Sequence, residues 1–77
     1  MTESATVSSL GARLRVARRD AGFTIARLAR ELGVDPRTVA GWQSGRSAPS
    51  VTRLIEIARL LKKPPSYFLD GDGGSAA

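Results

Sequence analysis

The side chains of this chain that could do chemistry are mostly basic. Twelve lysines and arginines face seven acidic residues, which gives a formal net charge of +5. All twelve basic residues lie between Leu10 and Pro65, where only four acidic residues occur, so that segment carries a charge of 12 − 4 = +8. A compact body with this excess repels itself unless an anionic partner neutralises it. Nucleic acid is the first candidate partner and an anionic membrane surface the second, while solubility alone is the simplest alternative.

Other kinds of chemistry lack their usual residues. The sequence contains no cysteine and no histidine, and its few carboxylates do not cluster, so most nucleophiles, general bases and metal-ligand sets are missing. We therefore expect no enzymatic activity, no metal and no cofactor. No apolar run approaches the roughly 18 residues of a transmembrane helix, and residues 1–9 lack the apolar stretch of a signal peptide. A cytoplasmic protein with no membrane role and no small-molecule ligand is expected.

The elements that must position the basic residues are helices. Apolar residues recur at helical spacing, and no alternating strand pattern occurs. The first apolar face consists of Leu10, Leu14, Ala17 and Ala21. The N-cap candidates are Ser8 or Ser9 for the first helix and Thr24, Asp35 and Ser50 for later helices, and the glycines suited to left-handed helix ends are Gly22, Gly33 and Gly45. The predicted helices cover residues 9–21, 25–32, 36–44, 51–62 and 65–69. Residues 9–70 form one predicted domain, and residues 1–8 and 71–77 are predicted to be flexible tails.

The second and third predicted helices form an informative pair. Ala29 is small enough to let two helices approach closely, and Gly33 permits the positive φ that a tight turn needs. Pro36 takes the first position of the third helix, where its missing N–H costs nothing, and Val39 supplies a branched core residue. Two short helices joined by such a turn are typical of a helix-turn-helix.

In these residues the chain resembles the Cro/C1-type (XRE) helix-turn-helix family, over about Leu10 to Gly71. The matching stretches, in order at the family's spacing, are LGARLRVAR (10–18), AGFT (21–24), LARELGVD (28–35), TVAGWQSGRSAPS (38–50) and LIEIARLL (54–61). The resemblance implies an all-α, compact, five-helix, lambda-repressor-like domain. It also implies a nucleoid-associated transcriptional regulator, with repression the expected role, that binds double-stranded DNA. The same fold can serve as a protein-interaction module, so the antitoxin of a toxin–antitoxin pair or an adaptor for another regulator is the alternative.

The resemblance further implies that the helix over residues 36–44 enters the major groove. Its outward face is predicted to hold the candidates for base reading: Pro36, Arg37, Ala40, Gly41 and Ser44. Of these only Arg37 has a long forked donor, which suits O6 and N7 of guanine, and a phosphate contact is the alternative. The candidates for phosphate contacts are Thr24, Ile25, Arg27, Thr38, Arg46 and Ser47. We interpret Arg13, Arg15 and Arg19 as surface charge.

Three positions depart from the family pattern. Ile25 stands where family members commonly carry a glutamine, so one phosphate anchor is lost or Ile25 packs inward. Gln43 replaces a glutamate that usually pairs with an arginine at the position of Arg18, so a neutral hydrogen bond is expected instead of an ion pair. Lys62 and Lys63 replace the usual glycine-plus-apolar turn after the fourth helix.

The aromatic side chains could lie either in the core or at the surface. The spacing of Trp42 from Val39 predicts a core position for the indole, and stacking on a base is the alternative. Tyr67 and Phe68 follow Pro64-Pro65, and they either cap the core or contribute to a dimer contact. We expect a homodimer on DNA because one reading helix offers limited specificity. The residues assigned to the dimer contact are Tyr67, Phe68 and Leu69.

Overall fold

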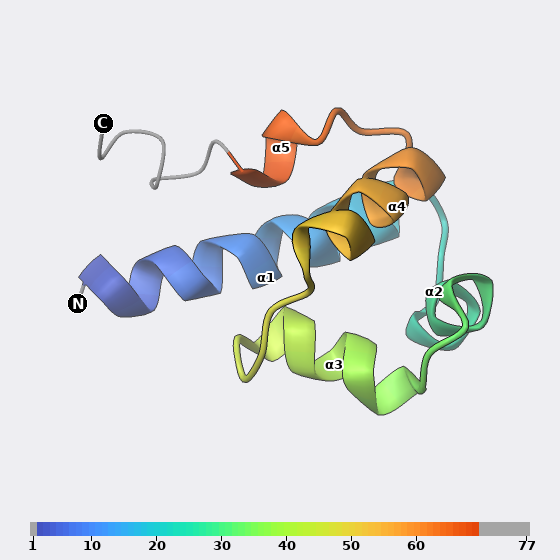
Figure 1. The fold of residues 1–77 in the computed structure, drawn as a ribbon, viewed down its shortest axis with the longest axis horizontal. Coiled ribbons are helices and arrows are strands. Elements are labelled where there is room, and N and C mark those ends of the chain that lie inside the picture. The colour runs from blue at the N-terminus through green and yellow to red at the C-terminus, as the bar shows by residue number, and fades with distance from the viewer. Residues whose placement is uncertain (1, 70–77) are drawn as a thin grey trace.

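A computed structural model places five α-helices along the chain (Figure 1), and it describes the backbone of residues 2–69 and the side chains of residues 10–69. The helices are α1 (Thr2–Asp20), α2 (Ile25–Leu32), α3 (Pro36–Ser44), α4 (Val51–Leu61) and α5 (Ser66–Leu69). No strand occurs within the described backbone. The predicted all-α fold class is confirmed, and α2 and α3 have the predicted bounds.

The first helix differs most from its predicted bounds. It begins at Thr2 and not near residue 9, so residues 2–8, which the sequence assigns to a flexible tail, belong to a helix. No glycine or proline occurs between residues 2 and 10, so nothing in that stretch interrupts the helical backbone ahead of Ser8 and Ser9. The predicted C-terminal tail over residues 71–77 lies outside the described residues.

N-cap side chains begin α2 and α3, and glycines in the left-handed conformation end them. The Thr24 hydroxyl accepts a hydrogen bond from the backbone N–H three residues later at 3.0 Å, and the Asp35 carboxylate caps α3 through a bond of 2.8 Å. Gly33 ends α2 with φ of 73°, and Gly45 ends α3 with φ of 84°. These are left-handed conformations that a side chain disfavours. The short turn between the helices is therefore encoded locally.

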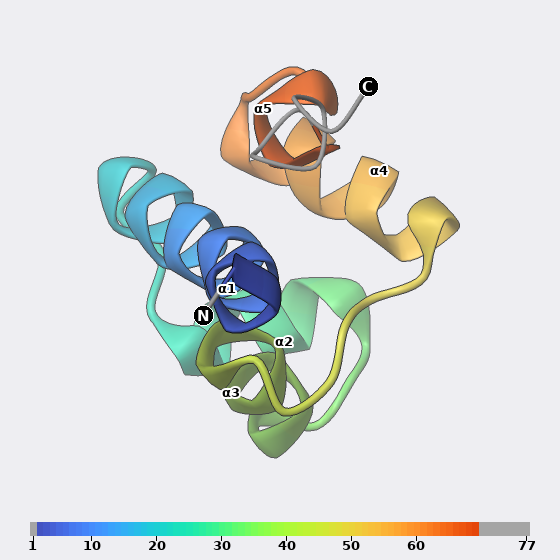
Figure 2. The same ribbon diagram turned by 90° about the vertical axis from the view of Figure 1, so that its left-hand side faces the viewer.

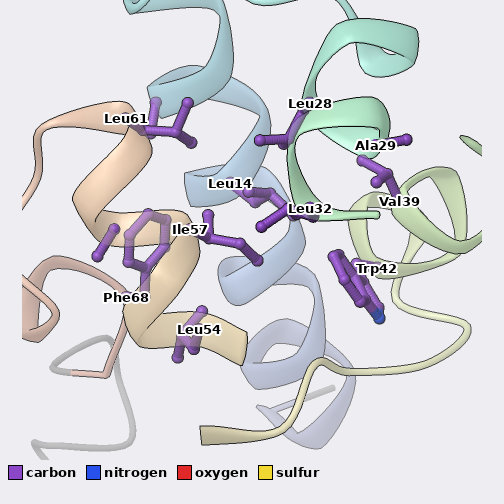
Figure 3. Close-up of a cluster of buried hydrophobic side chains, with 12 residues drawn as sticks. Leu14, Leu28, Ala29, Leu32, Val39, Trp42, Leu54, Ile57, Leu61 and Phe68 are labelled. Carbon is purple, nitrogen blue, oxygen red and sulfur yellow. The ribbon is translucent and has the colours of Figure 1, made fainter. Parts of the chain in front are cut away.

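One hydrophobic core receives residues from all five helices (Figure 3). Trp42 of α3 is 6% exposed and Phe68 of α5 is 4% exposed, so the core position predicted for Trp42 is confirmed. The largest fully buried side chains are Leu14, Leu28, Val39 and Ile57. Because interiors pack as densely as crystals, this shared core fixes the direction in which α3 presents its outer side.

The helix α1 lies against the C-terminal end of α3, and Figure 2 looks along α1 with α3 beneath it. Gly11 is buried at this contact. A Cβ at Gly11 would overlap the carbonyl oxygen of Gln43 and would lie 2.9 Å from that of Trp42. Only glycine lets the two backbones come this close. The sequence pattern assigns no role to Gly11, because its importance arises from a contact with residues far along the chain.

The end of α4 uses a residue that rarely adopts its conformation. Lys62 caps the helix with φ of 60°, and it is the one non-glycine residue with positive φ in the described chain. The Nζ atom of the following Lys63 lies 3.7 Å from a carboxylate oxygen of Asp20. The departure from the family's turn is therefore accommodated by a left-handed lysine and an ion pair to the end of α1.

Candidate nucleic-acid interface

One side of α3 is exposed along its whole length. Pro36, Arg37, Ala40 and Ser44 are exposed, whereas Val39 and Trp42 on the other side are buried. Two views show α3 at the edge of the molecule, on the other side of α1 from α5 (Figures 1 and 2). The structure thus brings four of the predicted base-reading residues onto one exposed surface.

Gly41, the fifth predicted residue, does not belong to that surface. It is buried, so its assignment to the exposed outward face is wrong. Its carbonyl oxygen accepts hydrogen bonds from the N–H groups of Arg46 at 3.0 Å and Ser47 at 3.3 Å, and from the Ser44 hydroxyl at 3.1 Å. The turn that follows α3 folds back over Gly41, which a helical periodicity argument cannot show. Gly41 therefore shapes the turn rather than the reading face.

Asp35 holds the guanidinium of Arg37 at the start of α3. The Nε and Nη2 atoms of Arg37 donate to the two carboxylate oxygens at 3.2 and 3.3 Å, and its backbone N–H donates to Oδ1 at 2.8 Å. The side-chain hydrogen bond from Arg37, followed by its backbone N–H, lowers the pKa of Asp35, and the carboxylate raises the pKa of Arg37. Two of the five guanidinium N–H groups are engaged in this way, so three remain to donate outward. The Arg37 side chain is 92% exposed, which leaves those donors accessible.

The start of α2 supplies a second part of the surface. Thr24 is exposed and its hydroxyl serves as the N-cap, while the guanidinium of Arg27 lies over the Phe23 ring, 4.3 Å from the centroid. Ile25 is partly buried against the core. Of the two alternatives for Ile25, inward packing is therefore the one observed. Its side chain is thus turned away from any phosphate, and the group left for the predicted contact is its backbone N–H at the positive end of the helix dipole.

The remaining phosphate candidates lie at the two ends of α3. Thr38 is exposed in the first turn of the helix, and Arg46 and Ser47 are exposed in the turn that follows Gly45. The backbone N–H groups of Arg46 and Ser47 are held by Gly41, so the turn is ordered while its side chains face outward. Basic and hydroxyl groups thus flank the exposed side of α3.

Arg18 ties the three elements of the site together. Its Nε donates to Oε1 of Gln43 at 2.6 Å, and its Nη1 donates to the carbonyl oxygen of Phe23 at 2.6 Å. The neutral hydrogen bond predicted at this position is confirmed. Desolvation, together with the positive charges of Arg19 and Arg15, lowers the pKa of Arg18. One guanidinium therefore links α1, the end of α3 and the loop that leads into α2.

Two further tethers carry no signal in the sequence pattern. Arg53 of α4 donates to the carbonyl oxygen of Leu32, the last residue of α2, at 3.0 Å and to Glu56 at 2.8 Å. Arg13 of α1 donates to the Tyr67 carbonyl oxygen at 3.1 Å. In a sequence, arginines on helix surfaces are normally interpreted as solvent-exposed charges. Only the packed structure shows that Arg13 and Arg53 hydrogen-bond to neighbouring helices.

The predicted dimer contact is largely covered within the monomer. Phe68 is buried and meets Tyr67 edge-on, with 5.0 Å between ring centroids. Tyr67 is partly buried, and its ring lies beneath the cations of Arg13 and Lys63. Leu69 alone of the three assigned residues is exposed, at 51%. The assignment of Phe68 to a dimer surface is wrong, because the ring is buried in the hydrophobic core of its own chain.

The described part of the chain offers neither a metal site nor a membrane span. Within it, no group of three or more acidic residues could hold a metal ion. None of the helices within residues 2–69 has the length and apolar character needed to cross a membrane.

Comparison with known proteins places this fold in a class. A family model described as Helix-turn-helix matches residues 14–68, which is more than half of the chain and includes every residue of α2, α3 and α4. The chain belongs to the Cro/C1-type (XRE) helix-turn-helix family.

Individual relatives agree with the family. The chain is 30% identical over 64 residues to the HTH-type transcriptional regulator DicA of Escherichia coli (strain K12), a match that covers 83% of this chain and 47% of DicA. It is 29% identical over 68 residues to uncharacterized HTH-type transcriptional regulators of Sinorhizobium medicae (strain WSM419) and Rhizobium meliloti (strain 1021), with 84% of this chain and 49% of each relative covered. The chain thus spans about half the length of these relatives. No solved structure matches it at a comparable level.

Proposed function

We propose that this chain is a sequence-specific DNA-binding module of a transcriptional regulator, which places α3 in the major groove. The observation that carries the proposal is the exposed side of α3, with an accessible Arg37 guanidinium braced by Asp35. An arginine held in a fixed orientation loses less side-chain freedom when it meets a guanine edge than a mobile one does. The hydrogen bonds to Asp35 restrain an exposed side chain only in part, so the three outward N–H groups are the feature that suits a guanine edge.

Dimensions and charge agree with this placement. The nine residues of α3 form an α-helix about 10–12 Å in diameter including side chains, and a major groove about 12 Å wide admits a helix of that diameter. The segment between Leu10 and Pro65 carries a charge of 12 − 4 = +8, which suits a polyanion. The relatives are named as transcriptional regulators, and repression is the mode we propose.

A homodimer on DNA is part of the proposal. The reading surface holds one long polar side chain, Arg37, so one copy gives limited discrimination, and two half-sites about one helical turn apart would double it. Leu69 is the accessible apolar residue of the predicted contact region. Sedimentation of the specific complex measures the stoichiometry, and one chain per site would contradict the dimer.

The test begins with selection of bound sequences from a random DNA pool, followed by affinity measurements on the selected and on random duplex. Arg37→Ala should weaken binding to the selected site by roughly five- to 150-fold per half-site, with little effect on random DNA and loss of preference at one base pair in each half-site. Arg46→Ala is the matched control for a backbone contact. It should weaken binding to both duplexes equally and reduce the salt dependence by about one unit per half-site.

Two outcomes would count against the proposal. Equal losses on both duplexes for Arg37→Ala would mean that Arg37 contacts the backbone and does not read sequence. Absence of salt-dependent binding to any duplex would favour the alternative, a protein-interaction module such as an antitoxin or an adaptor, because phosphate contacts release counterions and make binding salt-dependent.

A further inference from the structure

A basic groove runs between α1 and the C-terminal end of α3. It is lined by Ala12, Arg15, Val16 and Arg19 of α1 and by Gln43 and Ser44 of α3. Both arginines and Val16 are exposed, and Val16 is 49% exposed at the middle of the α1 wall. The sequence pattern alone treats the two arginines as surface charge. The structure shows that they face an open groove beside the end of the proposed reading helix.

The charge of this groove has one sign. No acidic residue lines it, and none of the ion pairs recorded within residues 10–69 includes Arg15 or Arg19. The positive charges of both residues act on Arg18, where they lower the pKa of its guanidinium. Each of the two groove arginines therefore repels the guanidinium of Arg18, and an anion in the groove would offset that repulsion.

The composition of the groove suits a sugar–phosphate strand better than a free anion. Arg15 and Arg19 lie four residues apart on α1, so their Cβ atoms are about 5–6 Å apart on one helix face, and both long side chains can reach one stretch of backbone. Ala12 and Val16 add an apolar part to the same wall, which matches the C–H surface of deoxyribose. A small anion would use the arginines and leave the apolar wall empty.

The position of Ser44 connects the groove to the exposed side of α3. Pro36, Ala40 and Ser44 are exposed at intervals of four residues, so they form one row along the helix. Ser44 ends this row and also lines the groove. A helix in the major groove has a sugar–phosphate backbone along each side. The strand that passes the C-terminal end of α3 would therefore cross α1 at Arg15 and Arg19.

We infer that Arg15 and Arg19 clamp the DNA backbone beside the C-terminal end of α3, which makes α1 a part of the interface in addition to α2 and α3. This inference rests on the proposed function. It assigns two phosphate contacts to side chains that the sequence pattern leaves as solvated charge.

The test is the salt dependence of binding to random-sequence duplex DNA, measured for the parent and for Arg15→Gln/Arg19→Gln. Loss of two phosphate contacts per chain should reduce the slope of log K against log salt by about 1.8 for each bound chain. This corresponds to roughly 60-fold weaker binding per chain at 0.1 M salt, provided that the affinity at 1 M salt is unchanged. The matched control is Arg30→Gln/Arg59→Gln. It removes the same charge from exposed residues of α2 and α4 that do not line the groove, and it should leave the slope close to that of the parent.

Two further variants and measurements make the result decisive. Arg15→Lys/Arg19→Lys keeps both charges and should restore most of the slope. Thermal melting of each double variant should match the parent, since these side chains are exposed. If the parent binds DNA and Arg15→Gln/Arg19→Gln keeps the parental slope, the inference is overturned while the proposed function stands. If the two glutamine variants lose slope equally, general charge rather than this groove is responsible, and the inference is again overturned. If the parent binds no DNA, the proposed function itself fails.

Discussion

Gly11 and Gly41 are both buried glycines in helix interiors, and the structure gives them opposite surroundings. At Gly11 a Cβ would overlap the Gln43 carbonyl oxygen and sit 2.9 Å from that of Trp42, whereas at Gly41 it would meet only the Ser47 hydroxyl, at 3.3 Å. Backbone atoms of a packed helix cannot turn aside, but the exposed serine side chain can. The same substitution, glycine to alanine, should therefore change stability in opposite directions.

The magnitudes follow from two competing effects. Alanine gains about 1 kcal/mol over glycine inside a helix, and this gain applies equally at both positions. Overpacking costs about 1–3 kcal/mol, and Gly11→Ala belongs at the upper end because α1 must move away from α3 as a whole. We expect Gly11→Ala to destabilise the domain by about 2 kcal/mol. We expect Gly41→Ala to be neutral or to stabilise it by up to about 1 kcal/mol.

Thermal unfolding followed by circular dichroism measures both changes. For a domain of this size each 1 kcal/mol shifts Tm by about 4–8 °C, so Gly11→Ala should lower Tm by roughly 8–16 °C while Gly41→Ala leaves it unchanged or raises it. Urea unfolding with unchanged m-values would show that the native and unfolded states are otherwise comparable. Equal shifts for the two variants, or a higher Tm for Gly11→Ala, would refute the close approach of α1 and α3.

Three more predictions test the core and the site. Trp42→Ala should cost about 3–5 kcal/mol, the usual loss for a large buried aromatic; a melting temperature within a couple of degrees of the parent would place the indole at the surface. Gln43→Glu should convert the hydrogen bond from Arg18 into an ion pair worth roughly 0.2–1 kcal/mol, and a gain in Tm that does not shrink with added salt would contradict this. Because the folded-state pKa of Asp35 is lowered, its stabilising contribution is complete above its unfolded pKa of about 3.9 and is lost as pH falls through the lower folded value. The parent's stability advantage over Asp35→Asn, followed by thermal melts from pH 7 to pH 2, should decline on acidification, and a constant advantage would exclude the Arg37 hydrogen bonds as its source.

Much of the fold could be predicted because its signals are local. Each N-cap forms its hydrogen bond within three residues, and each terminating glycine acts through its own φ, so α2 and α3 were predictable to the residue. The inward positions of Val39 and Trp42 follow from helical spacing. The start of α1 was missed because serines that could cap a helix also fit inside one, and no glycine or proline marks the boundary.

The candidate site was less predictable than the fold. The predictions that failed there depend on contacts between residues that lie far apart in the sequence. Helical periodicity assigns Gly41 to the outward side, but the turn at Arg46 and Ser47 folds over it. The same reasoning leaves Phe68 available for a partner, although its ring is buried in the core. Arg13 and Arg53 look like solvated surface arginines in the sequence, and only their partners in the packed structure identify them as tethers.

The sequence by itself determined the helices, the turn between α2 and α3, the basic character and the family, because caps, glycines and apolar spacing act over a few residues. The tertiary structure decided which arginines brace the fold, which face solvent, and that Gly11 lets α1 touch α3. It also decided that Arg15 and Arg19 share a groove with Ser44. The physical reason is that burial and charge proximity depend on which surfaces the helices bring together, and that pairing is a property of the packed core, not of any short segment.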